Sequence, residues 1–166
     1  AVKITGPARM EYLMSIFPDA QFVNIQREPI ATIRSWLEIY WNEQLTGQLW
    51  WQGAYTEEEL HEAKELSSNK FLFVAFQYKK LMETTQQEID KMHPDIYNAS
   101  YEDFVKEPKT LINDIMQFLH LQPSALADNF INKLFITNHN YRDAANKKTD
   151  ISEETNKQIL YILNAC

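Results

Sequence analysis

Apolar residues recur at spacings of three and four along most of the chain, which is the pattern of amphipathic helices. The predicted helices lie at residues 8–17, 29–41, 56–66, 70–92, 108–121, 124–136 and 152–164. Thr56 and Glu59 form a T-x-x-E capping box at the start of one of them, and Pro29 and Pro108 suit the first turn of two others. The sequence therefore predicts a helix-rich chain in which most helices bury one face.

Two short runs of strand-forming residues interrupt the helical pattern. One run occupies residues 22–27 and ends in Arg27, and the other occupies residues 95–100. We also expect residues 1–4 to be the end of a buried strand. Strands that alternate with helices favour an α/β fold, so we predict a three-layer parallel sheet flanked by helices, in a single domain that covers residues 1–166.

Composition narrows the class of protein. With 45% hydrophobic and 23% charged residues, the 166-residue chain is typical of an ordered globular domain. A net charge of −7 argues against broad nucleic-acid binding, although it leaves room for a small basic pocket that holds a phosphorylated ligand. No apolar run approaches the roughly 20 residues of a membrane span. The single cysteine, Cys166, favours a reducing compartment, which we expect to be a bacterial cytoplasm.

The segment FPDAQFVNIQREPIATIRS, residues 17–35, carries the most specific chemistry. Its predicted strand ends in Arg27 and turns directly into a helix. Ligands collect at the carboxyl ends of parallel strands, and a helix N-terminus supplies N–H groups for a phosphate. Arg27 adds a planar fork that can bond two phosphate oxygens, and Ser35 offers a hydroxyl two turns further along. Taken alone, Arg27 would more simply be a surface charge. The combination of Arg27 with Ser35 is what indicates a phosphate-binding site.

This segment resembles the sulfotransferase pattern FPDAKFIhivRDPraVvxSl nearly position for position. In that family the Arg and the Ser bind the 3′-phosphate of the sulfuryl donor PAPS (3′-phosphoadenylyl sulfate). The resemblance therefore implies that Arg27 and Ser35 hold this phosphate. Glu28 stands where the pattern has Asp, which keeps the charge near the start of the helix.

A second stretch, YEDFVKEP at residues 101–108, is similar to the YEDLv-x-dP segment of the same family. There the Tyr contacts the adenosine end of the donor, so the resemblance makes Tyr101 a third donor-binding candidate. Packing below the predicted strand is the alternative role for Tyr101. We expect Glu102 and Asp103 to cap or pair locally rather than to act in catalysis.

A third stretch, KITGPAR at residues 3–9, resembles the KxTGxPR stretch of a bacterial-type branch of the family. The resemblance implies that Lys3 neutralises charge on the transferring sulfonate, with a solvated lysine as the alternative. Thr5 stands where cytosolic sulfotransferases have a catalytic His, and a Thr hydroxyl is a poor base. The family's Gly- or Ser-rich loop for the 5′-phosphosulfate does not occur in the chain. We therefore expect the chain to be N-terminally incomplete, with this loop upstream of Ala1.

The resemblance implies a P-loop kinase-like sulfotransferase fold and an enzyme that moves a sulfonate from PAPS to a hydroxyl or amine. The expected acceptor is a small molecule or a glycan, and the expected product is adenosine 3′,5′-bisphosphate. The four histidines lack zinc-site spacing, so we expect no metal. One alternative is a non-catalytic nucleotide-binding relative or fragment. The other is a P-loop kinase that uses ATP, although no GxxxxGK[ST] motif occurs.

Two further groups of residues are weaker candidates. Lys147 and Lys148 lie late in the chain, where cytosolic sulfotransferases have basic residues for the 3′-phosphate, but solvated charges are the more common case. The chain also has a group of aromatic residues that can line an acceptor pocket or form a hydrophobic cluster. This group consists of Trp36, Tyr40, Trp41, Trp50, Trp51 and Tyr55.

Overall fold

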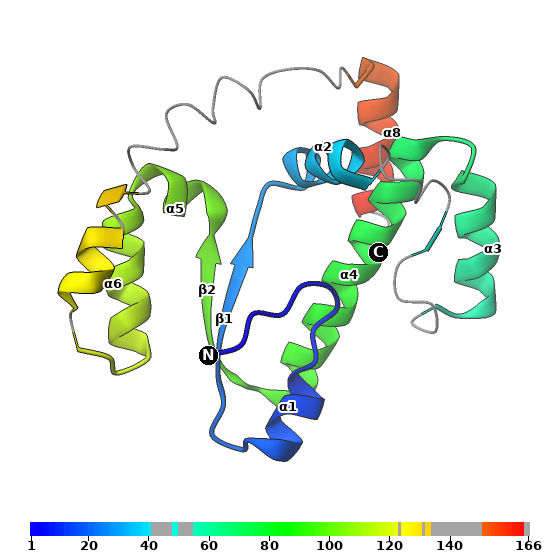
Figure 1. Ribbon diagram of the computed structural model, residues 1–166. Helices are drawn as coiled ribbons and strands as arrows, with labels where there is room; N and C mark the ends of the chain where they lie inside the picture. Colours follow the sequence, from blue (N-terminus) through cyan, green and yellow to red (C-terminus); the bar gives the residue numbers. More distant parts are fainter. Residues whose placement is uncertain (41–47, 50–54, 123, 131, 134–150, 165–166) are drawn as a thin grey trace. The chain divides into compact units, whose positions relative to one another are not determined.

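Helices form most of the described chain, together with one short parallel sheet (Figure 1). The computed structural model describes residues 1–40, 48–49, 55–122, 124–130, 132–133 and 151–164. The chain divides into two units. The first unit comprises Ala1–Pro18, Pro29–His93 and Asp150–Cys166, and the second comprises Asp19–Glu28 and Pro94–Thr149.

The parallel sheet belongs to the second unit. Its strands, β1 (Gln21–Gln26) and β2 (Asp95–Ser100), pair residue for residue, so that Gln26 at the end of β1 lies opposite Ser100 at the end of β2. Both arrows point the same way in Figure 1. Parallel strands need a long crossover, and residues 27–94 supply it. Both carboxyl ends therefore lie at one edge of the sheet, where α/β proteins bind ligands.

Two helices follow β2 in the second unit. α5 (Tyr101–Lys106) begins directly after the strand, because the Ser100 Oγ accepts the backbone N–H of Asp103 at 3.2 Å and caps the helix. α6 (Pro108–Phe118) has its proline in the first turn. Residues 125–130 and 132–133 are also helical.

α6 packs against β2 through aromatic rings. The ring centroids of Tyr97 on β2 and Phe118 on α6 are 5.7 Å apart. The backbone carbonyl of Phe118 also accepts a hydrogen bond from the Gln21 side chain of β1 at 3.4 Å. These contacts hold α6 against the sheet, and Leu111 of α6 is buried at 8% exposure.

Five helices make up the described part of the first unit, and the longest of them is α4. They are α1 (Met10–Ile16), α2 (Pro29–Tyr40), α3 (Glu57–Leu66), α4 (Lys70–Met92) and α8 (Glu153–Asn164). The other four all pack against α4. Ile33 of α2 and Ile159 of α8 are fully buried, and their shared cluster also contains Leu37, Val74, Ala75 and Tyr78.

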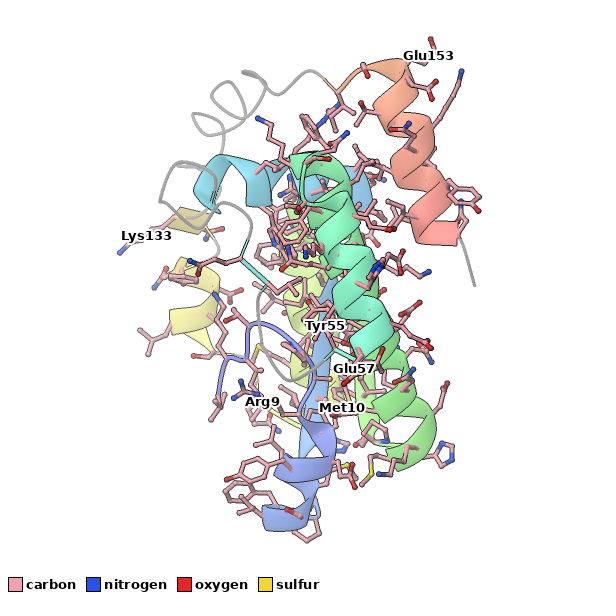
Figure 2. All side chains as sticks on the ribbon, turned by 90° about the vertical axis from the view of Figure 1, so that its right-hand side faces the viewer. Arg9, Met10, Tyr55, Glu57, Lys133 and Glu153 are labelled. Atoms are coloured by element: carbon pink, nitrogen blue, oxygen red, sulfur yellow. The ribbon has the colours of Figure 1, made fainter. Side chains whose placement is uncertain are left out.

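The start of α1 is held against α4 by polar contacts. The backbone N–H of Met10 donates to the Glu88 carboxylate of α4, and Lys91 pairs with Glu11 at 2.8 Å. Met10 is labelled where α1 begins in Figure 2. α4 itself ends at Met92. The next residue, His93, caps the helix with a left-handed φ of 45°, and Pro94 follows it.

Several predicted elements are confirmed and one is wrong. α2 begins at Pro29, α4 covers the predicted residues 70–92, and β2 covers the predicted residues 95–100. Residues 1–4 form no strand, and Val2 is 83% exposed. The reason is that the described sheet contains β1 and β2 alone, so no neighbouring strand takes up the hydrogen bonds of this segment.

Other predictions extend beyond what the structure describes. Residues 134–136, the end of one predicted helix, lie outside the described residues, as does Trp41 at the end of another. The described chain is a helix-rich α/β structure with a two-stranded parallel sheet, and the three-layer sheet and the single domain stay predictions. Among the described helices, none is both long and apolar enough to cross a membrane.

Candidate functional site at the carboxyl ends of the strands

The candidate site lies where β1 and β2 end. Arg27 is the first residue after β1, and Tyr101 is the first residue after β2. The guanidinium carbon of Arg27 lies 4.8 Å from the centroid of the Tyr101 ring, which is a cation–π contact. Because Gln26 and Ser100 are paired, Arg27 and Tyr101 continue the register of the sheet by one residue. The structure therefore brings together two of the four residues that the sequence predicts for the site.

The next pair along the chain is also in contact. The backbone N–H of Glu28 donates to Glu102 Oε1 at 3.1 Å, across 74 positions of sequence. Ser100 Oγ–H donates to the other oxygen of the same carboxylate at 3.2 Å. Glu102 therefore pairs locally with Ser100, as expected, and the sheet register also carries it to the turn after β1, which the sequence did not predict.

The electrostatics of the turn favour an ionised Glu102. The hydrogen bond from Glu28 is the largest cause that lowers the pKa of Glu102 below its ordinary value of 4.5. Ser100 and the positive charge of Arg27 act in the same direction. Glu102 is therefore a carboxylate at neutral pH, and the Arg27–Glu28 turn is held by a charged acceptor.

Ser35 and Lys3 belong to the first unit. Ser35 is half-buried on α2, the helix that begins two residues after Arg27. Lys3 is exposed in the segment before α1, which is neither helix nor strand. Their roles at the donor stay predictions.

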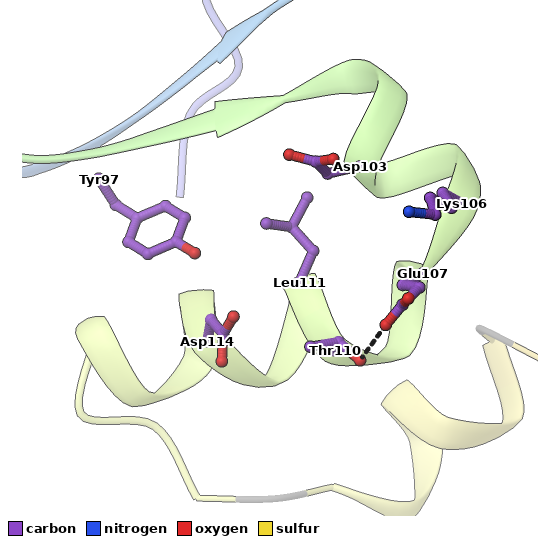
Figure 3. A pocket seen from close by; sticks show the side chains of 7 residues that line it. All are labelled: Tyr97, Asp103, Lys106, Glu107, Thr110, Leu111 and Asp114. Atoms are coloured by element: carbon purple, nitrogen blue, oxygen red, sulfur yellow. Dashed lines mark hydrogen bonds between the residues drawn. The ribbon is translucent and has the colours of Figure 1, made fainter.

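A pocket of about 270 Å³ opens between β2, α5 and α6 (Figure 3). It is lined by Tyr97, Asp103, Lys106, Glu107, Thr110, Leu111 and Asp114. Figure 3 shows the Tyr97 ring facing α6, and the hydrogen bond of 3.4 Å that Thr110 donates to Glu107. Three carboxylates and one lysine give the lining an excess of negative charge, which disfavours an anionic donor such as PAPS. None of the four predicted site residues lines this pocket.

Two of the aromatic residues that could line an acceptor pocket, Trp36 and Tyr55, pack into the first unit. The Trp36 ring meets Tyr78 edge to face, with centroids 6.2 Å apart, and the Tyr55 ring stacks on Phe76 at 6.0 Å. Both rings therefore contribute to hydrophobic clusters. Trp41, Trp50, Trp51, Lys147 and Lys148 lie outside the described residues, as does the side chain of Tyr40.

Histidines and carboxylates do not gather into a metal site in the part of the chain that the structure describes. There, no group of three or more His, Cys, Asp or Glu residues is placed to hold a metal ion. His61 lies on the exposed side of α3, with its Nδ1 3.6 Å from Glu65.

Residues 7–124 match the model of the sulfotransferase family, and the chain therefore belongs to that family. The matched residues contain Arg27, Ser35 and Tyr101, and they begin after Lys3. Searches among curated proteins and among solved structures found no match to the chain. Membership of the family supports a transferase with sulfotransferase activity and a P-loop-like fold.

Proposed function

We propose that the protein is a PAPS-dependent sulfotransferase that transfers a sulfonate to a hydroxyl or amine of a small-molecule or glycan acceptor. The observation that carries this proposal is the Arg27–Tyr101 pair, which lies at the ends of two parallel strands within the residues that match the family. The proposal includes the three-layer sheet of the P-loop kinase-like sulfotransferase fold, within one domain.

In this proposal Arg27 and Ser35 bind the 3′-phosphate of the donor, and Tyr101 contacts its adenosine end. A cation–π contact places the guanidinium over the face of the aromatic ring, whereas phosphate oxygens bind to guanidinium N–H groups. Tyr101 can therefore orient Arg27 while the arginine binds a phosphate. Tyr101 is 39% exposed, which leaves part of the residue accessible to a ligand.

The reaction itself occurs at the other end of the donor. The acceptor oxygen or nitrogen attacks sulfur, and the bond between sulfur and the bridging oxygen of the 5′-phosphate breaks. The acceptor loses a proton, and adenosine 3′,5′-bisphosphate leaves. The 3′-phosphate takes no part in these bond changes, so Arg27 contributes through binding and placing the donor. Lys3 is proposed to neutralise charge on the sulfonate.

A transfer assay tests this proposal. The protein is incubated with PAPS that carries a radiolabelled sulfonate and with a panel of phenols, amines and sugars, and labelled product and adenosine 3′,5′-bisphosphate are measured. We expect both products to form in equal amounts. Tight binding of adenosine 3′,5′-bisphosphate without transfer would favour the non-catalytic relative. Transfer from ATP but not from PAPS would favour the P-loop kinase.

A further inference from the structure

We infer that Glu102 is a positioning residue for Arg27, and that its carboxylate fixes the strand-to-helix turn that carries the arginine. This inference rests on the proposed function, because it concerns the same 3′-phosphate site. In the proposed function Glu102 does not touch PAPS, and the inference gives it a role through Arg27.

Two consecutive residues after β2 hold two consecutive residues after β1. The Tyr101 ring lies 4.8 Å from the guanidinium carbon of Arg27, and Glu102 accepts the backbone N–H of Glu28 at 3.1 Å. The first contact acts on the arginine side chain, and the second acts on the backbone directly after it. Together they restrict both the direction of the side chain and the course of the chain from which it extends.

The Glu102 carboxylate is itself held in place. Ser100 Oγ–H donates to Oε2 at 3.2 Å, which leaves Oε1 for the Glu28 N–H. Ser100 is the last residue of β2 and the N-cap of α5, so its hydroxyl lies on well-defined backbone. Hydrogen bonds to an ionised acceptor are roughly twice as strong as those between neutral groups. A charged and oriented acceptor therefore fixes the turn more firmly than a neutral side chain would.

Removing this acceptor should loosen the turn and leave the rest of the protein intact. Glu102 is exposed, so its truncation creates no cavity in a core. Arg27 and Tyr101 remain in the chain, but the turn that places the arginine loses its bond to Glu102. Affinity for the 3′-phosphate should then fall, while affinity for the rest of the nucleotide should not.

Calorimetric binding of adenosine 3′,5′-bisphosphate and of AMP to four full-length proteins tests the inference. These are the wild type, Glu102→Ala, Glu102→Gln and Asp103→Ala. We expect Glu102→Ala to reduce the preference for adenosine 3′,5′-bisphosphate about tenfold, the effect of one charge-assisted hydrogen bond. Glu102→Gln keeps an acceptor oxygen but loses the charge, so its preference should fall between those of Glu102→Ala and the wild type. Asp103→Ala removes the neighbouring carboxylate, which lines the pocket of Figure 3, and should change nothing.

The outcomes separate the inference from the proposed function. A wild type without preference for the 3′-phosphorylated nucleotide overturns both. A wild type with this preference and a Glu102→Ala variant that retains it overturns the inference alone. Equal losses for the two nucleotides, together with a lower melting temperature, show a merely structural role and also overturn it. Glu102→Gln behaving like Glu102→Ala contradicts the role of an acceptor at this position.

Discussion

At the scale of single residues, the side chain of Arg27, directly after β1, lies against the aromatic ring of Tyr101. The cation–π contact with Tyr101 orders the long Arg27 side chain before any ligand arrives, which reduces the entropy that binding must overcome. A phosphate bound at the edge of the guanidinium then gains two parallel hydrogen bonds. A lysine has neither the plane for stacking nor the fork for a phosphate.

This difference gives a prediction for two substitutions of Arg27. Arg27→Ala should weaken binding of adenosine 3′,5′-bisphosphate by about 2 to 4 kcal/mol, because a charged contact to the 3′-phosphate is lost. Arg27→Lys keeps the charge and should fall between the alanine variant and the wild type. Equilibrium binding measured by calorimetry reports both, with AMP as the ligand that should be little affected. An alanine variant with unchanged affinity for adenosine 3′,5′-bisphosphate contradicts the assignment of Arg27.

At the scale of elements, the first turn of α3 shows how local sequence and tertiary contact combine. Thr56 Oγ1 accepts the N–H of Glu59 at 3.2 Å, and Glu59 accepts the N–H of Thr56 at 2.7 Å, which completes the capping box. Lys80 of α4 then pairs with the Glu59 carboxylate. Burial alone raises the pKa of Glu59, but the hydrogen bonds from Lys80 and Thr56 outweigh it and lower the pKa below 4.5.

This pKa shift predicts a dependence of stability on pH. A carboxyl whose pKa is lowered by folding stabilises the protein above its unfolded pKa, and this contribution is lost as the pH falls through the lower folded value. The free energy of unfolding of the wild type should fall as the pH drops below about 4.5, and in Glu59→Gln this fall should be smaller. Urea denaturation at several pH values measures the free energy of unfolding of both proteins. The control is Glu57→Gln on the same turn of α3 (Figure 2). A decline that is the same in Glu59→Gln as in the wild type would argue against this coupling.

The elements also show which signals a sequence carries by itself. The capping box of α3 and the prolines that open α2 and α6 act within a few residues, and the structure confirms them. α5 was not predicted, although Ser100 followed by Asp103 is an S-x-x-D capping pattern that indicates its start. The strand predicted at residues 1–4 fails because a strand depends on a partner elsewhere in the chain.

At the scale of the whole molecule, the site depends on pairing between segments that are far apart in sequence. The residue types of β1 and β2 indicate strands, but their register follows from packing and not from either segment alone. Arg27 and Tyr101 were predicted separately by resemblance, and the register places them side by side. The contact of Glu102 with Glu28 follows from the same register, which is why no local sequence pattern predicts it.

The central claim is that the protein recognises a 3′-phosphorylated adenosine nucleotide. Adenosine 3′,5′-bisphosphate and ADP carry the same adenosine and the same number of phosphates, and differ in where the second phosphate lies. A ligand that binds the folded state raises the melting temperature by an amount that grows with the logarithm of the ligand concentration divided by its Kd. The most direct measurement is therefore the melting temperature of the full-length protein with each nucleotide at equal concentration. A clearly larger rise with adenosine 3′,5′-bisphosphate is the result that we predict, and equal rises, or none, would contradict the claim.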